Sequence, residues 1–349
     1  MLNEINNHKE NPIAVIGDFL DGQKWGRSIC STCSREFHSL KGGSNCMSEK
    51  CLGVQIPKDP NVGKVEAIEV GQKLANFFGN LGYEQSYPLG VVNRNNKWGK
   101  TSLVVSGVQR LVPYLSNGAY IAPKVFIAQP SVRTQYRGMD EDSDWSASSF
   151  VNPSIVHGGA NLDVHTCAIK SWLECLTDLG VDMNGVSLKQ RQSKDTWDEK
   201  EFTRNTLDMY FKGLHIADAI YSDDFPYGNN YRSFSDLGTG LERLTGVLNG
   251  GDFYIAQRPK DEVLQHPAYY DAVKALTLIV GTGVTPKDKD AWQFVKRYVL
   301  TMNETKTESA SVAENIDYFH KYWQPFVGEF QDKKSIENII LTESDSKAK

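Results

Sequence analysis

The chain has 349 residues, of which 40% are hydrophobic and 23% charged, and its formal net charge is −5. This composition is typical of an ordinary soluble globular protein, and the acidic balance gives no general basic field to attract nucleic acid. No apolar run approaches the roughly 18 residues of a membrane span, and the first residues contain no apolar signal core. We therefore expect a cytoplasmic protein without a membrane partner, with one main domain and a smaller one.

Four cysteines come first along the chain, as the pairs Cys30-x2-Cys33 and Cys46-x4-Cys51, with twelve residues between the pairs. Each short pair places two sulfurs on one turn, and the loop between them lets both pairs close around a tetrahedral Zn²⁺. Two disulfides are the alternative, but the lack of a signal sequence favours a reducing compartment and therefore zinc. Four cysteine ligands leave no open position, so we expect a structural zinc ion.

Apolar periodicity predicts the next elements. A helical stripe over residues 66–81 predicts a core-facing helix, and residues 102–109 are strand-like. Residues 124–136 alternate with period two, which predicts a strand that presents Gln129, Ser131 and Arg133 on one face. An exposed sheet face with a surface arginine is the ordinary interpretation of that pattern.

A loop over residues 134–148 follows this strand and leads to a second strand that begins at Ser149 and Phe150. The loop contains acidic side chains at positions 140, 141, 142 and 144. A carboxylate repels a phosphate by about 1 kcal/mol per pair even in water. The four carboxylates therefore repel a phosphate group that approaches this loop.

The most informative stretch covers residues 235–248. Gly238 and Gly240 let the backbone come close to a ligand, and the leucines and valine after them recur at helical spacing. Residues 213–221 read as a strand, so we expect a strand, a glycine-rich elbow and a helix that carries Arg243 near its start. An arginine held there supplies the forked cation that a phosphate needs. A simple turn with a surface arginine is the alternative.

Several phrases resemble those of one enzyme family. The Gly-x-Gly-Leu-Glu-Arg-Leu phrase ending at position 244 resembles motif 3 of class II aminoacyl-tRNA synthetases, and Asp236, seven residues before Arg243, makes it most similar to the alanyl-tRNA synthetase version. The segment from Gln129 to Arg133 resembles the first strand of motif 2, and the helix over 66–81 resembles motif 1. The cysteine pairs resemble the opening of archaeal-type alanyl-tRNA synthetases. The resemblance covers roughly residues 24–310.

The resemblance implies roles for named residues. Arg133 would bridge the amino acid carboxylate and the α-phosphate of ATP, Arg243 would hold the γ-phosphate, and Asp236 would take the substrate ammonium group. The nucleotide would also contact Gln129, Phe150 and Gly240, although Phe150 is about as well explained as a core residue. Gly238 and Thr239 would line a pocket for a small side chain, which implies alanine, glycine or serine. Mg²⁺ would bridge the phosphates.

The fold implied is α+β, with helices flanking an antiparallel sheet. The boundaries that we expect are an N-terminal tail (1–23), a zinc-binding knuckle (24–60), a class II synthetase-like catalytic domain (61–255), a helical region resembling a truncated tRNA-recognition domain (256–331) and a polar tail (332–349).

Two positions depart from the family pattern. Val151 stands where relatives normally have glutamate, and Asp288 stands where an asparagine helps to read the acceptor stem of tRNA. An aspartate only accepts hydrogen bonds and is repelled by phosphates. We therefore expect a truncated stand-alone paralogue that activates a small amino acid for a carrier protein or a small molecule. The alternatives are a minimal enzyme that charges tRNA(Ala) and a catalytically silent regulatory or binding module.

Overall fold

The computed structural model describes residues 11–56, 64–97, 99–117, 124–134, 147–197, 199–227, 230–251, 267–306 and 311–347. The chain divides into two compact units: the first comprises residues 1–56 and 157–237, and the second comprises 57–156 and 238–349. The chain changes unit three times, after residue 56 and inside the strands β5 (Ser149–Gly158) and β9 (Asn230–Thr239). None of the helices in the described ranges combines the length and apolarity that a membrane span requires.

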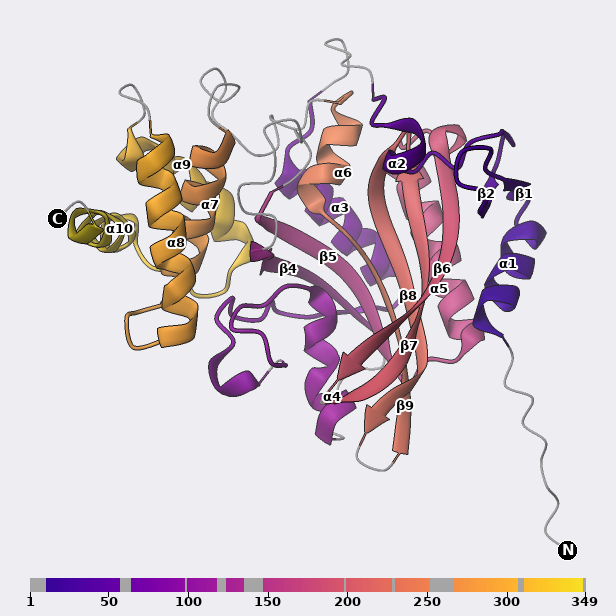
Figure 1. Cartoon of the computed structure of the whole chain (residues 1–349), viewed down its shortest axis with the longest axis horizontal. Coiled ribbons are helices and arrows are strands. Elements are labelled where there is room, and N and C mark those ends of the chain that lie inside the picture. Colours follow the sequence, from indigo (N-terminus) through magenta and orange to yellow (C-terminus); the bar gives the residue numbers. More distant parts are fainter. Residues whose placement is uncertain are drawn as a thin grey trace, which may run out of the picture. The chain divides into compact units, whose positions relative to one another are not determined.

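The first unit is built on a sheet with the strand order β1-β2-β6-β7-β8-β9 (Figure 1). Pairing is antiparallel from β1 to β8. A glycine is required in the turn after β7, because a Cβ at Gly213 would lie 1.7 Å from the carbonyl oxygen of Gly53. The remaining bounds are β1 (Gly26–Ile29), β2 (Glu36–Ser39), β6 (Val186–Trp197), β7 (Lys200–Phe211) and β8 (Leu214–Tyr227).

Helices α1 (Pro12–Gly22) and α5 (Leu162–Asp178) pack against each other in the first unit, α1 also contacting β6 and α5 contacting β8. Helix α1 begins after an asparagine cap, whose side chain accepts a hydrogen bond from the N–H of Ile13, and its Pro12 suits a first helical position. Ile16 and Leu20 are fully buried. The predicted N-terminal tail over 1–23 therefore contains a packed helix from Pro12 onward. The same unit contains α2 (Glu49–Leu52) and the 3₁₀ turn η4 (Met183–Gly185).

The second unit contains the strands β5-β4-β3, with β3 (Glu84–Gln85) parallel and β5 antiparallel to β4 (Val125–Val132). Helix α3 (Ala67–Asn80) packs on β4 and on α6 (Leu241–Leu248), so the predicted helix over 66–81 is confirmed. The predicted strand over 102–109 is wrong. Its second half begins the 3₁₀ helix η2 (Gly107–Leu111), because Ser106 and Gln109 form a capping box. Two short helices complete this part, η1 (Arg94–Asn96) and α4 (Val112–Asn117).

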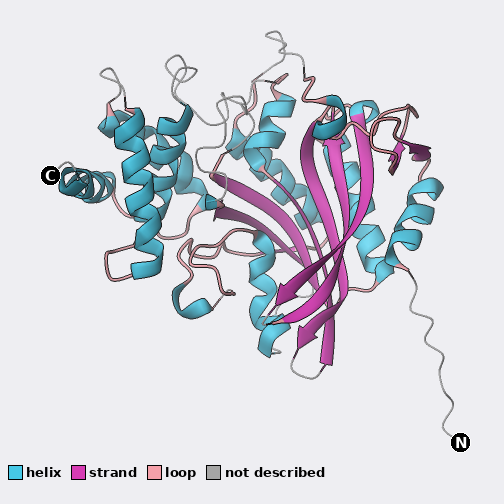
Figure 2. Ribbon diagram, viewed as in Figure 1, coloured by secondary structure: helices cyan, strands magenta, loops and turns pink. Residues whose placement is uncertain are grey.

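The C-terminal part of the second unit is helical (Figure 2), with helices that pack on one another. Its elements are α7 (Pro267–Gly281), α8 (Lys289–Thr305), α9 (Val312–Trp323), η6 (Gln324–Phe326) and α10 (Lys333–Lys347). Helix α10 corrects the prediction of a polar tail over 332–349, because Ile336 and Ile340 are fully buried and anchor it. The mixed α+β architecture with mainly antiparallel strands agrees with the fold class predicted from the sequence.

The predicted elbow before α6 is also corrected. Residues 235–239 belong to the end of β9, and helix α6 begins only two residues after that strand ends. The predicted strand over 213–221 is present as part of β8, which continues to Tyr227. The glycine-containing segment thus begins within β9, which neighbours β8 in the sheet, and continues through Gly240 into α6.

Candidate functional site

Arg133 lies directly after β4, in the second unit. Its Nε donates a hydrogen bond of 3.0 Å to the carbonyl oxygen of Val105. Its guanidinium carbon lies 4.9 Å from the centroid of the Phe150 ring, which β5 presents near the same end of the β4–β5 pair. A cation over an aromatic face is attracted by the ring quadrupole. These two contacts hold the half-buried guanidinium in a defined direction.

Arg243 lies in the first turn of α6, which is capped by Gly240. Gly240 has an extended backbone with φ −87° and ψ 116°, and a Cβ there would make only an ordinary contact with Arg243 at 3.7 Å. Neither local conformation nor packing thus demands glycine at this position. The side chain of Arg243 is half-buried.

Glu242, beside Arg243, ties α6 to β5. Both of its carboxylate oxygens accept a hydrogen bond of 3.1 Å from the backbone N–H of Val151. Since Val151 follows Phe150, and Phe150 lies under Arg133, a short chain of contacts connects the two segments that carry the predicted phosphate-binding arginines. The structure thus brings the motif 2-like and motif 3-like segments together within the second unit.

The carboxylate of Glu242 also meets two groups from the C-terminal helices. Lys274 of α7 places its ammonium 3.0 Å from Glu242 Oε1, and the hydroxyl of Tyr322 of α9 donates to the same oxygen over 2.5 Å. Lys274 lies over the rings of Tyr322 and Trp323, at 4.8 and 5.1 Å from their centroids. Burial and the charge of Glu242 raise the pKa of Tyr322 well above its ordinary value, so the hydroxyl remains a donor. We call Glu242, Lys274 and Tyr322 the α6 anchor.

Gly238 and Thr239 are the last two residues of β9. A Cβ at Gly238 would lie 2.8 Å from Ser154 Oγ and 3.1 Å from Asn152 Nδ2, so close packing on β5 requires glycine there. The side chain of Asn152 also donates a hydrogen bond of 2.8 Å to the carbonyl oxygen of Thr239. Asp236 lies two residues earlier on β9 and is buried. The tight packing explains Gly238 without a ligand, whereas a pocket for a small side chain stays a prediction.

Gln129 of β4 is paired inside the second unit, and its predicted contact with the nucleotide stays a prediction. Its side chain is fully buried. Its Oε1 accepts from the N–H of Leu89 at 2.7 Å, and its Nε2 donates to the carbonyl oxygen of Leu89 at 3.0 Å. The amide therefore pairs with the Leu89 backbone much as a neighbouring strand would. The period-two pattern placed Gln129 on the correct strand but could not show that its face is internal.

The predicted acidic loop over 134–148 lies mostly outside the described residues, including all four of its carboxylates. Its C-terminal base is described. Ser148 donates to Asp271 of α7 from its backbone N–H at 2.8 Å and from its hydroxyl at 2.6 Å. The start of β5 is thus held by the C-terminal helices, close in sequence to Phe150.

Asp288, at the position that the resemblance associates with tRNA reading, is engaged within the second unit. Arg94 donates to both carboxylate oxygens, at 2.8 Å from Nε and 3.3 Å from Nη2. The backbone N–H of Thr285 donates to Asp288 Oδ2 at 2.9 Å. The hydrogen bond from Arg94 is the main cause of a lowered pKa for Asp288. Asp288 therefore closes the turn before α8.

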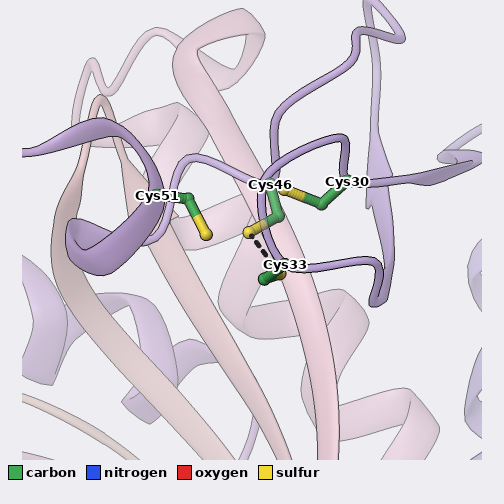
Figure 3. Close-up of side chains that lie close together, drawn as sticks. All are labelled: Cys30, Cys33, Cys46 and Cys51. Carbon is green, nitrogen blue, oxygen red and sulfur yellow. Dashed lines mark hydrogen bonds between the residues drawn. The ribbon is translucent and has the colours of Figure 1, made fainter.

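The four N-terminal cysteines converge in the first unit (Figure 3), with all four sulfurs within 4.8 Å of one another. All four are free thiols, and Cys30 and Cys46 are fully buried. The sulfurs of Cys33 and Cys46 are 3.8 Å apart. Zinc–sulfur bonds of about 2.3 Å in a tetrahedron place sulfurs about 3.8 Å apart. The donor set thus fits Zn²⁺ in both chemistry and spacing.

The thiols differ strongly in acidity. Burial disfavours the thiolate of Cys30, but backbone hydrogen bonds in the loop outweigh burial and lower its pKa to about 6. At Cys51, a hydrogen bond with Ser48 favours the thiolate, but burial and the neighbouring cysteines outweigh it and raise the pKa to about 11. The raised pKa of Cys51 keeps this thiol protonated at neutral pH unless a metal ion binds its sulfur.

Asp208, His215 and Asp218 form a second group with ligand atoms within 4.8 Å of one another, on β7 and β8. Arg191 donates to Asp208 at 2.7 Å from Nε and at 3.3 Å from Nη2. Burial opposes ionisation of Asp208, but hydrogen bonds from His215 and Arg191 outweigh burial and lower the pKa of the carboxyl group. Arg191 thus neutralises the charge of the Asp208 carboxylate, and this group is better explained as an ion pair than as a site for a metal cation.

Sequence reasoning missed the residues that support both candidate sites. These are the α6 anchor, Asp271 and a lysine beside the cysteine sulfurs, Lys189. Glu242 stands directly before Arg243 in the sequence, but its partners Lys274 and Tyr322 lie 32 and 80 residues further along the chain. No local pattern identifies them.

No protein-family model and no curated protein sequence matches the chain. Among solved structures, it is similar to the PylSc pyrrolysyl-tRNA synthetase of Desulfitobacterium hafniense, with 15% identity, a TM-score of 0.38, and 56% of this chain and 72% of that chain covered. It is also similar to a Leishmania major Friedlin protein assigned as an aspartyl-tRNA synthetase, with 11% identity, a TM-score of 0.35, and 56% and 64% of the chains covered. Similarity at this level assigns the chain to no family.

Proposed function

We propose that this protein activates a small amino acid with ATP, forming an aminoacyl-adenylate and pyrophosphate. The observation that carries the proposal is the hydrogen bonding between Val151 and Glu242, because it ties the segment of Arg133 and Phe150 to that of Arg243. Two arginines supplied by separate parts of the chain are what a triphosphate and a carboxylate need for fixed binding.

The proposed reaction is a displacement at the α-phosphorus. An oxygen of the amino acid carboxylate forms a bond to that phosphorus, the bond to the bridging oxygen breaks, and pyrophosphate leaves with the electron pair. Arg133 would orient the carboxylate and the α-phosphate, and Arg243 would hold the γ-phosphate. The protein contributes positioning and charge neutralisation rather than covalent chemistry. Mg²⁺ would neutralise charge on the leaving phosphates.

Asp236, Gly238 and Thr239 are the proposed amino acid contacts. A buried carboxylate on β9 is suited to a substrate ammonium group, because a charge-assisted hydrogen bond offsets the cost of burying both charges. Gly238 itself packs on Ser154 and Asn152, so the pocket for a small side chain at Gly238 and Thr239 is what the resemblance to motif 3 implies. We therefore propose alanine, glycine or serine as the substrate.

We propose a carrier-protein thiol or a small molecule as the acceptor of the activated amino acid. The contacts of Asp288 support this choice, because its carboxylate is committed to Arg94 and to the turn before α8. A group that already accepts these hydrogen bonds, and that repels phosphates, is a poor reader of a tRNA stem. Transfer of alanine to tRNA(Ala) in vitro would overturn this part of the proposal.

Amino acid-dependent exchange of labelled pyrophosphate into ATP tests the activation step. We expect exchange with one of the three small amino acids, and a fall of about 10²–10³-fold in Arg243→Gln, as for loss of other groups that stabilise transition-state charge. Arg297→Gln, on the exposed face of α8, is the matched control and should retain exchange. No exchange with any amino acid, together with ATP binding by calorimetry, would instead indicate a silent binding module.

A further inference from the structure

Lys189 of β6 is a buried lysine that faces the cysteine sulfurs. Its side chain is only 8% exposed. Its Nζ lies 3.3 Å from Cys33 Sγ and 3.4 Å from Cys46 Sγ. Lysines are almost never buried to this extent without an anionic partner, because removing the charge from water is costly. The two sulfurs are therefore candidates for that partner.

The carboxylate nearest to Lys189 in the strand register already has a cationic partner. Asp208 is directly opposite Lys189 on β7, but Arg191 donates to both of its oxygens. Along β6, the hydroxyl of Ser187 donates to the carbonyl oxygen of Cys46. Two side chains of β6, at alternate positions and thus on one face, therefore contact the cysteine loop.

Charge explains why a lysine would be placed there. Four thiolates around Zn²⁺ carry a net charge of −2, and a buried cluster with this charge is unfavourable unless it is compensated. One ammonium group reduces the net charge to −1. N–H donors on a cation form stronger hydrogen bonds to anions than neutral donors do, and groups that hydrogen-bond to metal ligands orient them and tune the metal.

We propose that Lys189 is a positioning residue of the zinc centre, donating hydrogen bonds to the thiolates of Cys33 and Cys46 and compensating the charge of the cluster. It does not bind the metal itself. This inference rests on the proposed zinc site but not on the adenylate chemistry, so the two proposals fail separately.

The test compares three variants of the whole 349-residue chain, each loaded with zinc. Lys189→Met keeps the apolar stem without the charge, and Lys189→Arg keeps the charge. Lys194→Met, further along β6, removes an exposed lysine that donates to Thr203 and serves as the control. Zinc affinity is measured by competition with a chromophoric chelator. We expect Lys189→Met to weaken zinc binding by about 10–100-fold, Lys189→Arg to restore most of it, and Lys194→Met to leave it unchanged.

The absorption spectrum of the cobalt-substituted protein distinguishes a hydrogen bond to the thiolates from a purely structural role of Lys189, which would leave the spectrum unchanged. In Lys189→Met, the tetrahedral d–d bands should persist, while the sulfur-to-cobalt charge-transfer band should move to lower energy as the thiolates lose a donor. Unchanged affinity and an unchanged charge-transfer band would overturn the proposal. If Lys189→Met does not fold, cadmium NMR of the wild type decides: coupling between cadmium and the Lys189 ammonium protons supports the hydrogen bonds, and its absence overturns them. A wild type that binds no zinc removes the zinc site and this inference together.

Discussion

The two units each bury a lysine, but they neutralise it in different ways. Lys274, 2% exposed, faces Glu242, a group that ionises readily, with aromatic rings around it. Lys189, 8% exposed, faces cysteine sulfurs, and a bound metal ion would deprotonate the cysteines that ligate it. The charged centre of the second unit is thus complete with protein groups alone, whereas that of the first unit would be completed by the zinc ion that we propose.

Removal of zinc should give the largest effect and tests this contrast directly. Structural zinc contributes roughly 10–16 kcal/mol of apparent binding free energy in small zinc-dependent peptides. In Cys46→Ser, or after chelation, we expect amide hydrogen exchange to accelerate strongly over residues 26–56 and to change little over α7 and α9. Equal acceleration of exchange in both regions would contradict the claim that only the first unit is stabilised by zinc. A chelator should have no further effect on Cys46→Ser.

Loss of the lysine in the α6 anchor should come next. Lys274→Met leaves the carboxylate of Glu242 buried without its cation, which costs about 3–5 kcal/mol. Urea unfolding measures the change in free energy of unfolding, with Lys289→Met at the exposed start of α8 as the control. The double variant with Glu242→Gln should recover part of the loss, because no unpaired charge then remains. A loss below about 1 kcal/mol, the range of surface pairs, would show that the pair is not buried in solution.

The hydroxyl of Tyr322 should contribute less than the ammonium of Lys274. Tyr322→Phe removes one donor to Glu242 Oε1 and keeps the ring under Lys274. Hydrogen bonds to charged groups contribute about 1.5–3 kcal/mol, and we expect a destabilisation in that range by urea unfolding. Tyr87→Phe, at a side chain that is 88% exposed, is the matched control. Equal effects of the two substitutions would exclude a role for the hydroxyl in the anchor.

The ion pair of Arg94 and Asp288 should have the smallest effect. The Arg94 side chain is 52% exposed, and pairs this accessible to water contribute about 0.2–1 kcal/mol. Because Arg94 lowers the pKa of Asp288 in the folded state, the contribution is present above the ordinary aspartate pKa of about 3.9 and is lost as the pH falls through the lowered value. A double-mutant cycle of Arg94→Gln and Asp288→Asn, measured at neutral and acidic pH, tests both the size and the sign.

The sequence by itself determined features that depend on local spacing. Local spacing predicted three features: the clustering of the four cysteines, the helix from Ala67 to Asn80 and the strand before Arg133. Each depends on residue intervals or on apolar periodicity within a short stretch of chain. The same local logic failed at Gly107, where a capping box stops a strand-like run, and over residues 332–349, where a polar composition predicted a tail but α10 is packed through Ile336 and Ile340.

Only the tertiary structure decided which charges are paired. Lys189 lies 156 residues after Cys33, and Tyr322 lies 80 residues after Glu242, so no periodicity connects them. Gln129 illustrates the same limit, because its pattern identified a strand face but not the Leu89 backbone that covers it. A charged or amide side chain is stable in the interior only with a matching partner, and the fold alone supplies that partner.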